Sequence, residues 1–254
     1  MKDRADWLPA GAIALGVGLA ALPFAVALPL AALVPVWLAS TVLRSIAPVH
    51  QHCHAHYPVF HARLANSAYD AILMLAAGNT TAVWELQHVL GHHRVYLEGA
   101  RDPAYSRRFT ADGPWQRALF TVAGDAMSVR DSFAITGWRP ANRRYRGRLI
   151  RQVAVQVAVL AVLVAWQPST ALAFAILPAL LLRWAVFWFS YAQHHDLPMH
   201  DVYSGSVTHF GWTNRWFLNV GHHTAHHEKP TLHWSRLPAR TQQIIERIPS
   251  VCLR

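Results

Sequence analysis

The chain has 254 residues, of which 53% are hydrophobic and only 14% are charged, and its formal net charge is +10. Soluble proteins average about 25% charged residues, so this composition favours a membrane protein with the length of a single domain, residues 1–254. The two cysteines, Cys53 and Cys252, exclude a disulfide framework, a four-cysteine iron–sulfur cluster and a CxxC redox pair.

The first apolar run, residues 7–43, contains no charged residue. It is long enough for two membrane helices of about 20 residues each. Pro23 and Pro29 break the run where a connection is needed. We therefore predict transmembrane spans at about 7–24 and 28–46, joined as a hairpin.

The middle of the chain alternates between apolar and polar segments. Residues 66–84 are apolar except for Asp70 and are interrupted at Gly78, which predicts an interfacial or re-entrant pair of helices. Residues 94–148 are polar and predict an extramembrane loop with a short amphipathic helix around 115–135.

A second apolar block follows and is interrupted by Gln167-Pro168. It predicts two more spans, at about 150–166 and 169–191, which form a second hairpin. The predicted fold is thus an all-α membrane protein with four transmembrane helices in two hairpins.

Basic residues are distributed unevenly about these spans. Both predicted hairpin connections lack Lys and Arg, whereas residues 44–151 carry 14 arginines. The positive-inside rule then places both termini and the long loop in the cytoplasm. We expect an integral protein of the bacterial inner membrane, with its histidine clusters on the cytoplasmic side.

Three histidine clusters, at residues 50–56, 88–93 and 222–227, stand out in this apolar chain. Residues three or four apart share a face of a helix, so each cluster can direct several imidazoles at one point. The sets that meet this spacing are His50 with His54, His88 with His92, and His223 with His226 and His227. We expect one multi-histidine metal site.

The number of imidazoles limits which metal site the clusters can form. Imidazole suits Zn, Cu, Fe and Ni, but a structural zinc takes four ligands, and these clusters offer enough for two metals. Two redox-active irons beside a membrane could activate dioxygen to attack a hydrocarbon. The alternative is a non-enzymatic, histidine-rich metal carrier. Transporters usually place ionisable ligands within their spans, and the predicted spans here contain no histidine.

The clusters also carry a family resemblance. The pattern N-x-G-x-H-x-x-H-H-x-x-P, from Asn219 to Pro230, resembles the last histidine box of membrane fatty acid desaturases and of bacterial carotenoid ketolases in the same superfamily. Residues 88–93, followed by Asp102-Pro103, resemble the second box, and residues 50–54 resemble the first. Gln193-His194 resembles the isolated histidine that completes the metal shell.

The resemblance implies a four-helix membrane enzyme with a cytosolic helical cap and a cofactor of two Fe ions. The implied metal ligands are His50, His54, His88, His92, His93, His194, His223, His226 and His227, with Asn219 acting through a water molecule. The reaction implied is oxygen-dependent oxidation of a lipid chain, with fatty acyl desaturation as our first choice. The alternative is a hydroxylase or ketolase acting on a carotenoid or another hydrocarbon.

The resemblance also implies an external electron donor. The chain has no G-x-G-x-x-G, haem or flavin motif, so the donor is expected to be a separate protein of ferredoxin, rubredoxin or cytochrome b5 type. The basic run Arg139–Arg151 is a candidate docking patch for an acidic donor, or an anchor to anionic headgroups. We expect a lipid substrate and no nucleic-acid partner.

Three assignments remain open in the sequence. His52 and His56 form a second pair with the spacing of His50 and His54, and His222 could replace His223. Asn219 could hold a metal-bound water or cap a helix. The histidines that we expect to be structural or superficial are His61, His195, His200, His209 and His233.

Two positions depart from the family pattern. Gln51 stands where an acidic residue often follows the first histidine of the first box, and Ala225 stands where a glutamate often precedes the final pair. Neither change removes a ligand. Both alter the surroundings of the ligands, which tune metal affinity.

Overall fold

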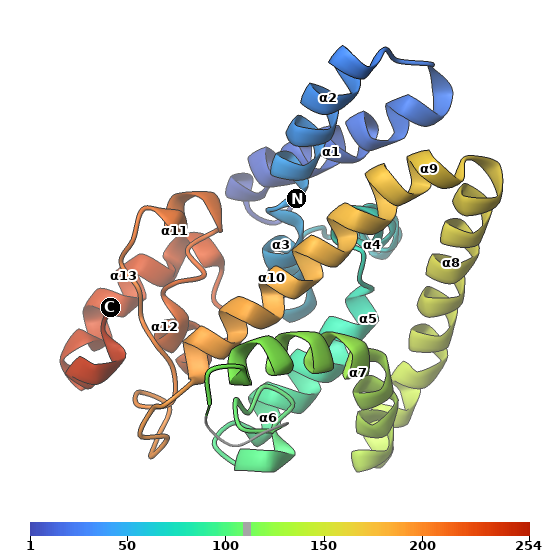
Figure 1. Cartoon of the computed structure of the whole chain (residues 1–254). Helices are drawn as coiled ribbons and strands as arrows, with labels where there is room; N and C mark the ends of the chain where they lie inside the picture. Colours follow the sequence, from blue (N-terminus) through green and yellow to red (C-terminus); the bar gives the residue numbers. More distant parts are fainter. Residues whose placement is uncertain (109–112) are drawn as a thin grey trace. The chain divides into compact units, whose positions relative to one another are not determined.

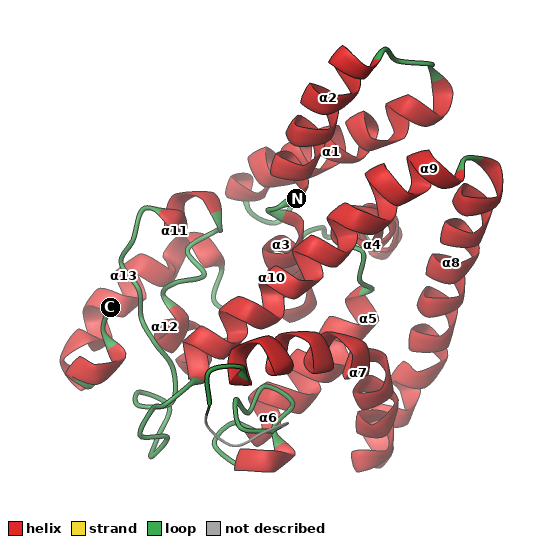
Figure 2. Ribbon diagram, in the orientation of Figure 1, coloured by secondary structure: helices red, strands yellow, loops and turns green. Residues whose placement is uncertain are grey.

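The computed structural model describes residues 1–108 and 113–254. These residues form helices and loops, and their only β-type pairings are isolated bridges from Thr208 to His222 and to Leu253 (Figure 2). The described part of the chain is therefore all-α, as predicted. Within the predicted loop, positions 109–112 lie outside the described residues.

The chain forms two compact units, each built from segments that are separate in the sequence. Unit 1 comprises Met1–His54, Pro58–Ala82 and Arg144–Arg183; unit 2 comprises Ala55–Tyr57, Val83–Arg143 and Trp184–Arg254. Helices α3 (Ala47–His56), α5 (Thr81–Val83) and α10 (Leu177–His194) contribute residues to both units. The single domain of residues 1–254 stays a prediction.

Four helices in the described residues are long and apolar enough to cross a membrane. They are Arg4–Ala25, Leu30–His56, Pro140–Trp166 and Pro168–His194. The second continues ten residues beyond its predicted end because the first histidine cluster is itself helical. The third begins ten residues early because the basic run is helical as well. These helices support an integral membrane protein; their hairpin pairing and orientation stay predictions.

Unit 1 is built around the N-terminal helices and those near residue 160 (Figure 1). Its remaining helices are α1 (Trp7–Ala25), α2 (Leu30–Arg44), α4 (Arg63–Ala77), α8 (Arg144–Trp166), α9 (Pro168–Ala171) and the π-helix η5 (Leu172–Ile176). Helices α1 and α2 pack closely, because the Ser40 hydroxyl donates to the Gly16 carbonyl at 3.0 Å.

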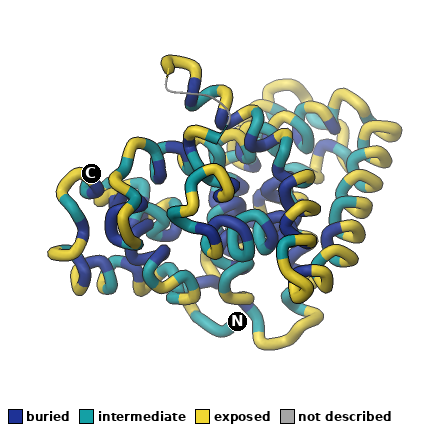
Figure 3. Tube along the Cα trace, turned by 90° about the horizontal axis from the view of Figure 1, so that it is seen from below, coloured by how far each residue is buried: buried dark blue, intermediate teal, exposed yellow. Residues whose placement is uncertain are grey.

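The apolar side chains of unit 1 do not all turn inward. Leu149 is the one buried residue of α8, and Val157 and Val162 are exposed. Exposed positions recur along the helical turns of the chain (Figure 3). A helix that presents apolar residues all round suits lipid as its solvent.

Arg44 is buried within unit 1, with 1% of its surface exposed. Its guanidinium donates to three backbone carbonyls, those of Leu75, Ala76 and Phe174, at 2.8–3.1 Å. Two of these carbonyls lie in the last turn of α4, where no helical N–H reaches them. Arg44 therefore acts as a distant cap for α4 and ties it to η5.

Helix α4 ends at Gly78, which confirms the predicted break in residues 66–84. Gly78 has a φ of 68°, a left-handed conformation that favours glycine, and its N–H donates to the Met74 carbonyl. A side chain there would also collide with Ala179. The break lets the chain turn from α4 into α5 and the second histidine cluster.

Unit 2 contains the other helices. They are the π-helix η2 (Trp84–His92), α6 (His93–Val95), α7 (Gln116–Trp138), α11 (Thr213–Trp216), α12 (His223–Glu228) and α13 (Leu237–Ile244). Helix α7 is the amphipathic helix predicted around 115–135. Short 3-10 turns occur in unit 1 at Arg4–Asp6 and in unit 2 at Gly99–Arg101, Pro140–Arg143, Trp234–Arg236, Ile245–Arg247 and Ser250–Cys252.

The C-terminal segment of unit 2 fixes the position of α12. Its apolar cluster consists of Tyr203, Ala225, Leu237, Ile244, Ile248 and Cys252. Glu228 at the end of α12 is held by Arg240 of α13. Ala225 is fully buried in this cluster, so a glutamate at this position would bury a charge among apolar side chains.

Replacing Arg44 with methionine should destabilise the protein. The change leaves three buried carbonyl groups without their donor, and we expect the free energy of unfolding to fall by about 3–5 kcal/mol. Thermal unfolding of the detergent-purified protein, followed by tryptophan fluorescence, measures the loss. Arg146→Met, at an exposed position of α8, is the matched control. Equal midpoints for the two variants would contradict the capping role.

Candidate metal centre

Unit 2 gathers eight histidines from four segments of the chain. The end of α3 provides His56; η2 and α6 provide His88, His92 and His93; the end of α10 provides His194; α12 provides His223, His226 and His227. All but His56 were predicted as ligands. The structure thus assembles parts of all three clusters and the isolated histidine within one unit.

The first group includes His56, His88, His93 and His226, whose potential ligand atoms lie within 4.8 Å of one another. The Nε2 atom of His93 lies 3.0 Å from that of His88 and 3.1 Å from that of His226. The ring of His56 lies edge-on to these three rings, at centroid distances of 4.7–5.1 Å.

The second group consists of His92, His194 and His227, whose ligand atoms also lie within 4.8 Å of one another. His227 Nε2 lies 3.3 Å from His92 Nε2. His223 joins this group at its edge, because its Nε2 lies 3.1 Å from that of His194 and 3.2 Å from that of His227.

A π-helical turn decides how the second cluster is divided between the groups. α-Helical spacing predicted that His88 and His92 act together. In the structure His88 pairs with His93, while His92 joins the other group. Residues 84–92 form a π-helix, in which hydrogen bonds connect residues five apart. One stretch of η2 and α6 therefore serves both groups.

Hydrogen bonds on the outer side of two rings fix which nitrogen faces inward. His92 Nδ1 lies 2.8 and 2.9 Å from the two Asp102 carboxylate oxygens, and His194 Nδ1 lies 3.0 Å from the Gly205 carbonyl. A carboxylate and a carbonyl only accept, so both Nδ1 atoms carry hydrogen. In the neutral ring each Nε2 then presents a lone pair to the centre, the state required of a metal ligand.

The second group fits a cation better than it fits a hydrogen-bonded chain. Its Nε2 atoms follow one another in the order His92, His227, His223, His194. Both ends of this chain are lone pairs, so four neutral rings cannot alternate donor and acceptor along it. At least one contact would join two lone pairs or two N–H groups, whereas a central cation satisfies every lone pair.

Burial keeps His227 neutral. The pKa of His227 lies well below its ordinary value, first because the ring is buried and then because charges on His93 and His223 would repel it. Tyr96 stacks on His227 with ring centroids 4.1 Å apart and covers one of its faces. A neutral imidazole is the ligating form, so the site is prepared for a metal.

The donor chemistry fits iron. Both groups supply imidazole nitrogen, which suits Fe as well as Zn, Cu and Ni. With metal–nitrogen bonds of about 2.1 Å, two ligands of one ion lie roughly 3.0–3.4 Å apart, and the Nε2 pairs lie 3.0–3.3 Å apart. Two adjacent groups match the two ions expected.

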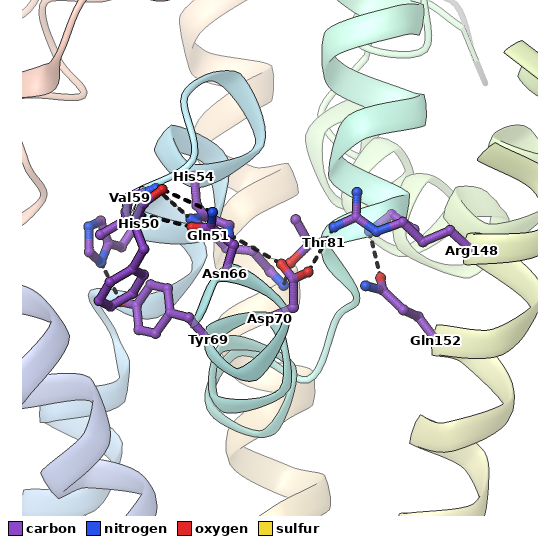
Figure 4. A network of polar contacts seen from close by, with 12 residues as sticks. His50, Gln51, His54, Val59, Asn66, Tyr69, Asp70, Thr81, Arg148 and Gln152 are labelled. Atoms are coloured by element: carbon purple, nitrogen blue, oxygen red, sulfur yellow. Dashed lines mark hydrogen bonds and ion pairs between the residues drawn. The ribbon is translucent and has the colours of Figure 1, made fainter. Parts of the chain in front are cut away.

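His50 and His54 have other partners, within unit 1 (Figure 4). His50 Nε2 lies 3.1 Å from Asp6, and its Nδ1 lies 2.6 Å from the Tyr69 hydroxyl. His54 accepts from a backbone N–H through Nδ1 and faces Asp70 through Nε2 at 3.3 Å. Neither histidine occurs in the two groups of unit 2.

These contacts belong to a buried polar network. Burial alone would raise the pKa of Asp70, but its hydrogen bond with His54 and the charge of Arg148 lower it overall. Arg148 reaches Asp70 at 2.7 Å. Gln51 donates to the Asn79 carbonyl and contacts Thr81, so the residue that departs from the family pattern serves this network.

The other candidates are placed as follows. The side chain of Asn219 donates to the Trp234 carbonyl, and its φ of 58° uses the tolerance of asparagine for left-handed backbone. His222 contacts Thr241 at 3.0 Å, whereas His223 meets the second group. His195 stacks on Tyr191 and belongs to neither group.

Sequence reasoning did not assign roles to several of these residues. His56 was visible only as the alternative partner of His52. Asp102 was noted in the sequence, but nothing in its spacing connects it with His92. Tyr96 and the Gly205 carbonyl carry no sequence signal, because their contacts arise from tertiary packing.

Comparison of the sequence with known protein families gives one match that is consistent with a histidine-rich metal centre. A family model described as Fatty acid desaturase matches residues 27–254, which is most of the chain. No curated protein and no solved structure gives a significant match.

The two possible ligand pairs of the first histidine cluster, His50 with His54 and His52 with His56, predict different effects of mutation. His56→Ala removes a nitrogen from the first group, so we expect iron content to fall to about half. His54→Gln keeps polar atoms in the unit 1 network and should retain most of the iron while lowering thermal stability. Metal analysis and thermal unfolding of membrane-inserted protein measure both effects. Iron loss in His54→Gln with full iron in His56→Ala would reverse the assignment.

His194 and His195 provide a second adjacent pair. His194→Ala removes a central lone pair from the second group and should lose iron and nearly all activity. His195→Ala removes the stacking on Tyr191 and a contact with the Ser106 hydroxyl, and neither belongs to the two groups, so both quantities should stay near those of the parent protein. Iron content and product yield, normalised to inserted protein, make the comparison. An inactive His195 variant beside an active His194 variant would contradict the geometry.

Proposed function

Because the chain belongs to the fatty acid desaturase family, we propose that it is an oxygen-dependent di-iron oxidoreductase that desaturates a fatty acyl chain. Family membership indicates a lipid-modifying oxidoreductase. The observation that supports the di-iron centre is the pair of adjacent all-histidine groups in unit 2.

We assign the first ion to His56, His88, His93 and His226, and the second to His92, His194, His223 and His227. His52 lies one turn before His56 on α3, so helical spacing directs it to the same face. We propose it as a further ligand of the first ion. This assignment uses His52 and His56 in place of the expected ligands His50 and His54, which lie on another face of α3.

When bound, the two irons would supply the oxidising power, drawn from dioxygen and two external electrons, that cleaves an unactivated carbon–hydrogen bond. The protein's own residues hold and orient the ligands. Asp102 fixes the His92 ring and raises its basicity as a ligand. The half-buried Tyr96 covers one face of the buried His227 ring, and this cover limits the access of water to the site.

The membrane arrangement is part of the proposal. Four apolar helices support an integral membrane protein, and the arginine bias supports cytoplasmic termini and a cytoplasmic metal centre in a bacterial inner membrane. A separate protein of ferredoxin, rubredoxin or cytochrome b5 type would deliver the electrons. The exposed arginines of the basic run, among them Arg144 and Arg146, are the proposed docking patch.

Expression in a host that lacks the product should create a new lipid. We expect a double bond in a fatty acyl chain, detected by mass spectrometry of total lipids, and its absence with His226→Ala. Lys229→Ala, just beyond the ligands at an exposed position, is the control and should behave like the parent chain. A new hydroxyl or ketone in place of the double bond would show that the enzyme is a hydroxylase or a ketolase and not a desaturase. An unchanged lipid profile with an iron-loaded protein and a competent donor would contradict lipid oxidation.

A further inference from the structure

Helix α7 presents apolar side chains to its surroundings and buries polar ones. Trp115, just before the helix, is 74% exposed, and Leu119 and Val122 are 50% and 53% exposed. Ala126 and Phe133 continue the same face at helical spacing. The buried polar residues on the opposite face are Gln116, Thr121, Asp125, Ser128, Asp131, Ser132 and Thr136. This polarity is the reverse of that of a helix on a water-soluble domain.

The polar side chains on the buried face of α7 have hydrogen-bond and ion-pair partners. Asp131 pairs with Arg108 at 2.5 and 2.7 Å, and Gln116 accepts from the Tyr191 hydroxyl at 2.8 Å. The hydroxyls of Ser128 and Ser132 donate to carbonyls of the helix itself. The polar face of α7 therefore packs against the rest of unit 2. The exposed face of Trp115, Leu119, Val122, Ala126 and Phe133, called the apolar stripe below, is left for an external partner.

The stripe adjoins a membrane-spanning helix within unit 2. Trp184, Trp188 and Phe189 of α10 are exposed, and they lie in the candidate span Pro168–His194. Arg117 of α7 lies over the Trp188 ring at 3.8 Å and donates to its backbone carbonyl. Tryptophan beside arginine is typical of the bilayer interface.

The charges on α7 also suit a lipid surface. Its two acidic residues, Asp125 and Asp131, are buried, whereas Arg130 is exposed along the apolar stripe. The exposed charge of the helix is therefore positive. A helix that joins an apolar face to exposed arginines binds interfaces with anionic headgroups.

We propose that α7 lies in the membrane interface, with Trp115, Leu119, Val122 and Phe133 inserted into the acyl layer of an anionic bilayer. The charges at residues 117, 125, 130 and 131 prevent it from spanning the bilayer. Its inner face packs on η2, since a side chain at Gly91 would meet Ile135 at 2.9 Å. The ligand-bearing π-helix is then one helix layer, about 8–10 Å, from the lipid.

Spin labels test this proposal on the whole chain in nanodiscs of phosphatidylcholine and phosphatidylglycerol that hold one copy each. The test position is Leu119→Cys. Val162→Cys, 64% exposed on the span α8, is the lipid reference, and Gln242→Cys, exposed on α13, is the water reference. Unsubstituted protein gives the background from Cys53 and Cys252. Collision rates with oxygen and with a water-soluble nickel chelate are compared.

We expect the oxygen-to-nickel collision ratio at Leu119 to match that at Val162 and to exceed that at Gln242 severalfold. A ratio equal to that at Gln242 would overturn the proposal and leave the stripe for a protein partner. Protection of Leu119 from both agents would also overturn it, because the face would be covered by protein. The lipid-like ratio at Val162 confirms in the same sample that the chain is inserted.

Discussion

The site depends on the cost of burying imidazole lone pairs against one another. Four Nε2 atoms of the second group form a chain of contacts at 3.1–3.3 Å, and hydrogen bonds on the outer side make both of its ends lone pairs. Neutral rings cannot pair along such a chain, and burial opposes charging them. A metal cation removes the conflict, so binding and local stability are coupled in this part of the protein.

The surrounding fold serves to hold these rings in place. The C-terminal apolar cluster seats α12, and its buried Ala225 sets the rotation that turns the three histidines of that helix toward the centre. The π-helical turn spreads the second cluster over both groups. In unit 1 a separate polar network engages His50 and His54, so α3 carries histidines for two different purposes.

Much of this was predictable from local sequence. The apolar runs predicted four span-length helices. The clusters, together with the family resemblance, predicted His88, His92, His93, His194, His223, His226 and His227, all of which the structure brings together. The register of the first cluster was not predictable, because both pairs have identical spacing. The choice between the two pairs depends on the partners of His50 and His54. These partners are Asp6, Tyr69 and Asp70, which are distant from the two histidines in the sequence. The partner of His88 was missed because a π-helix carries no sequence signal as clear as an apolar period.

The central claim is that two ions bind to two histidine groups in unit 2, one of which contains His56. Anomalous scattering at the iron absorption edge from crystals of the iron-loaded protein tests it most directly. The account predicts two peaks, one within bonding distance of His56, His88, His93 and His226, and the other of His92, His194 and His227. A single peak, or a peak bonded to His50 and His54, would contradict it.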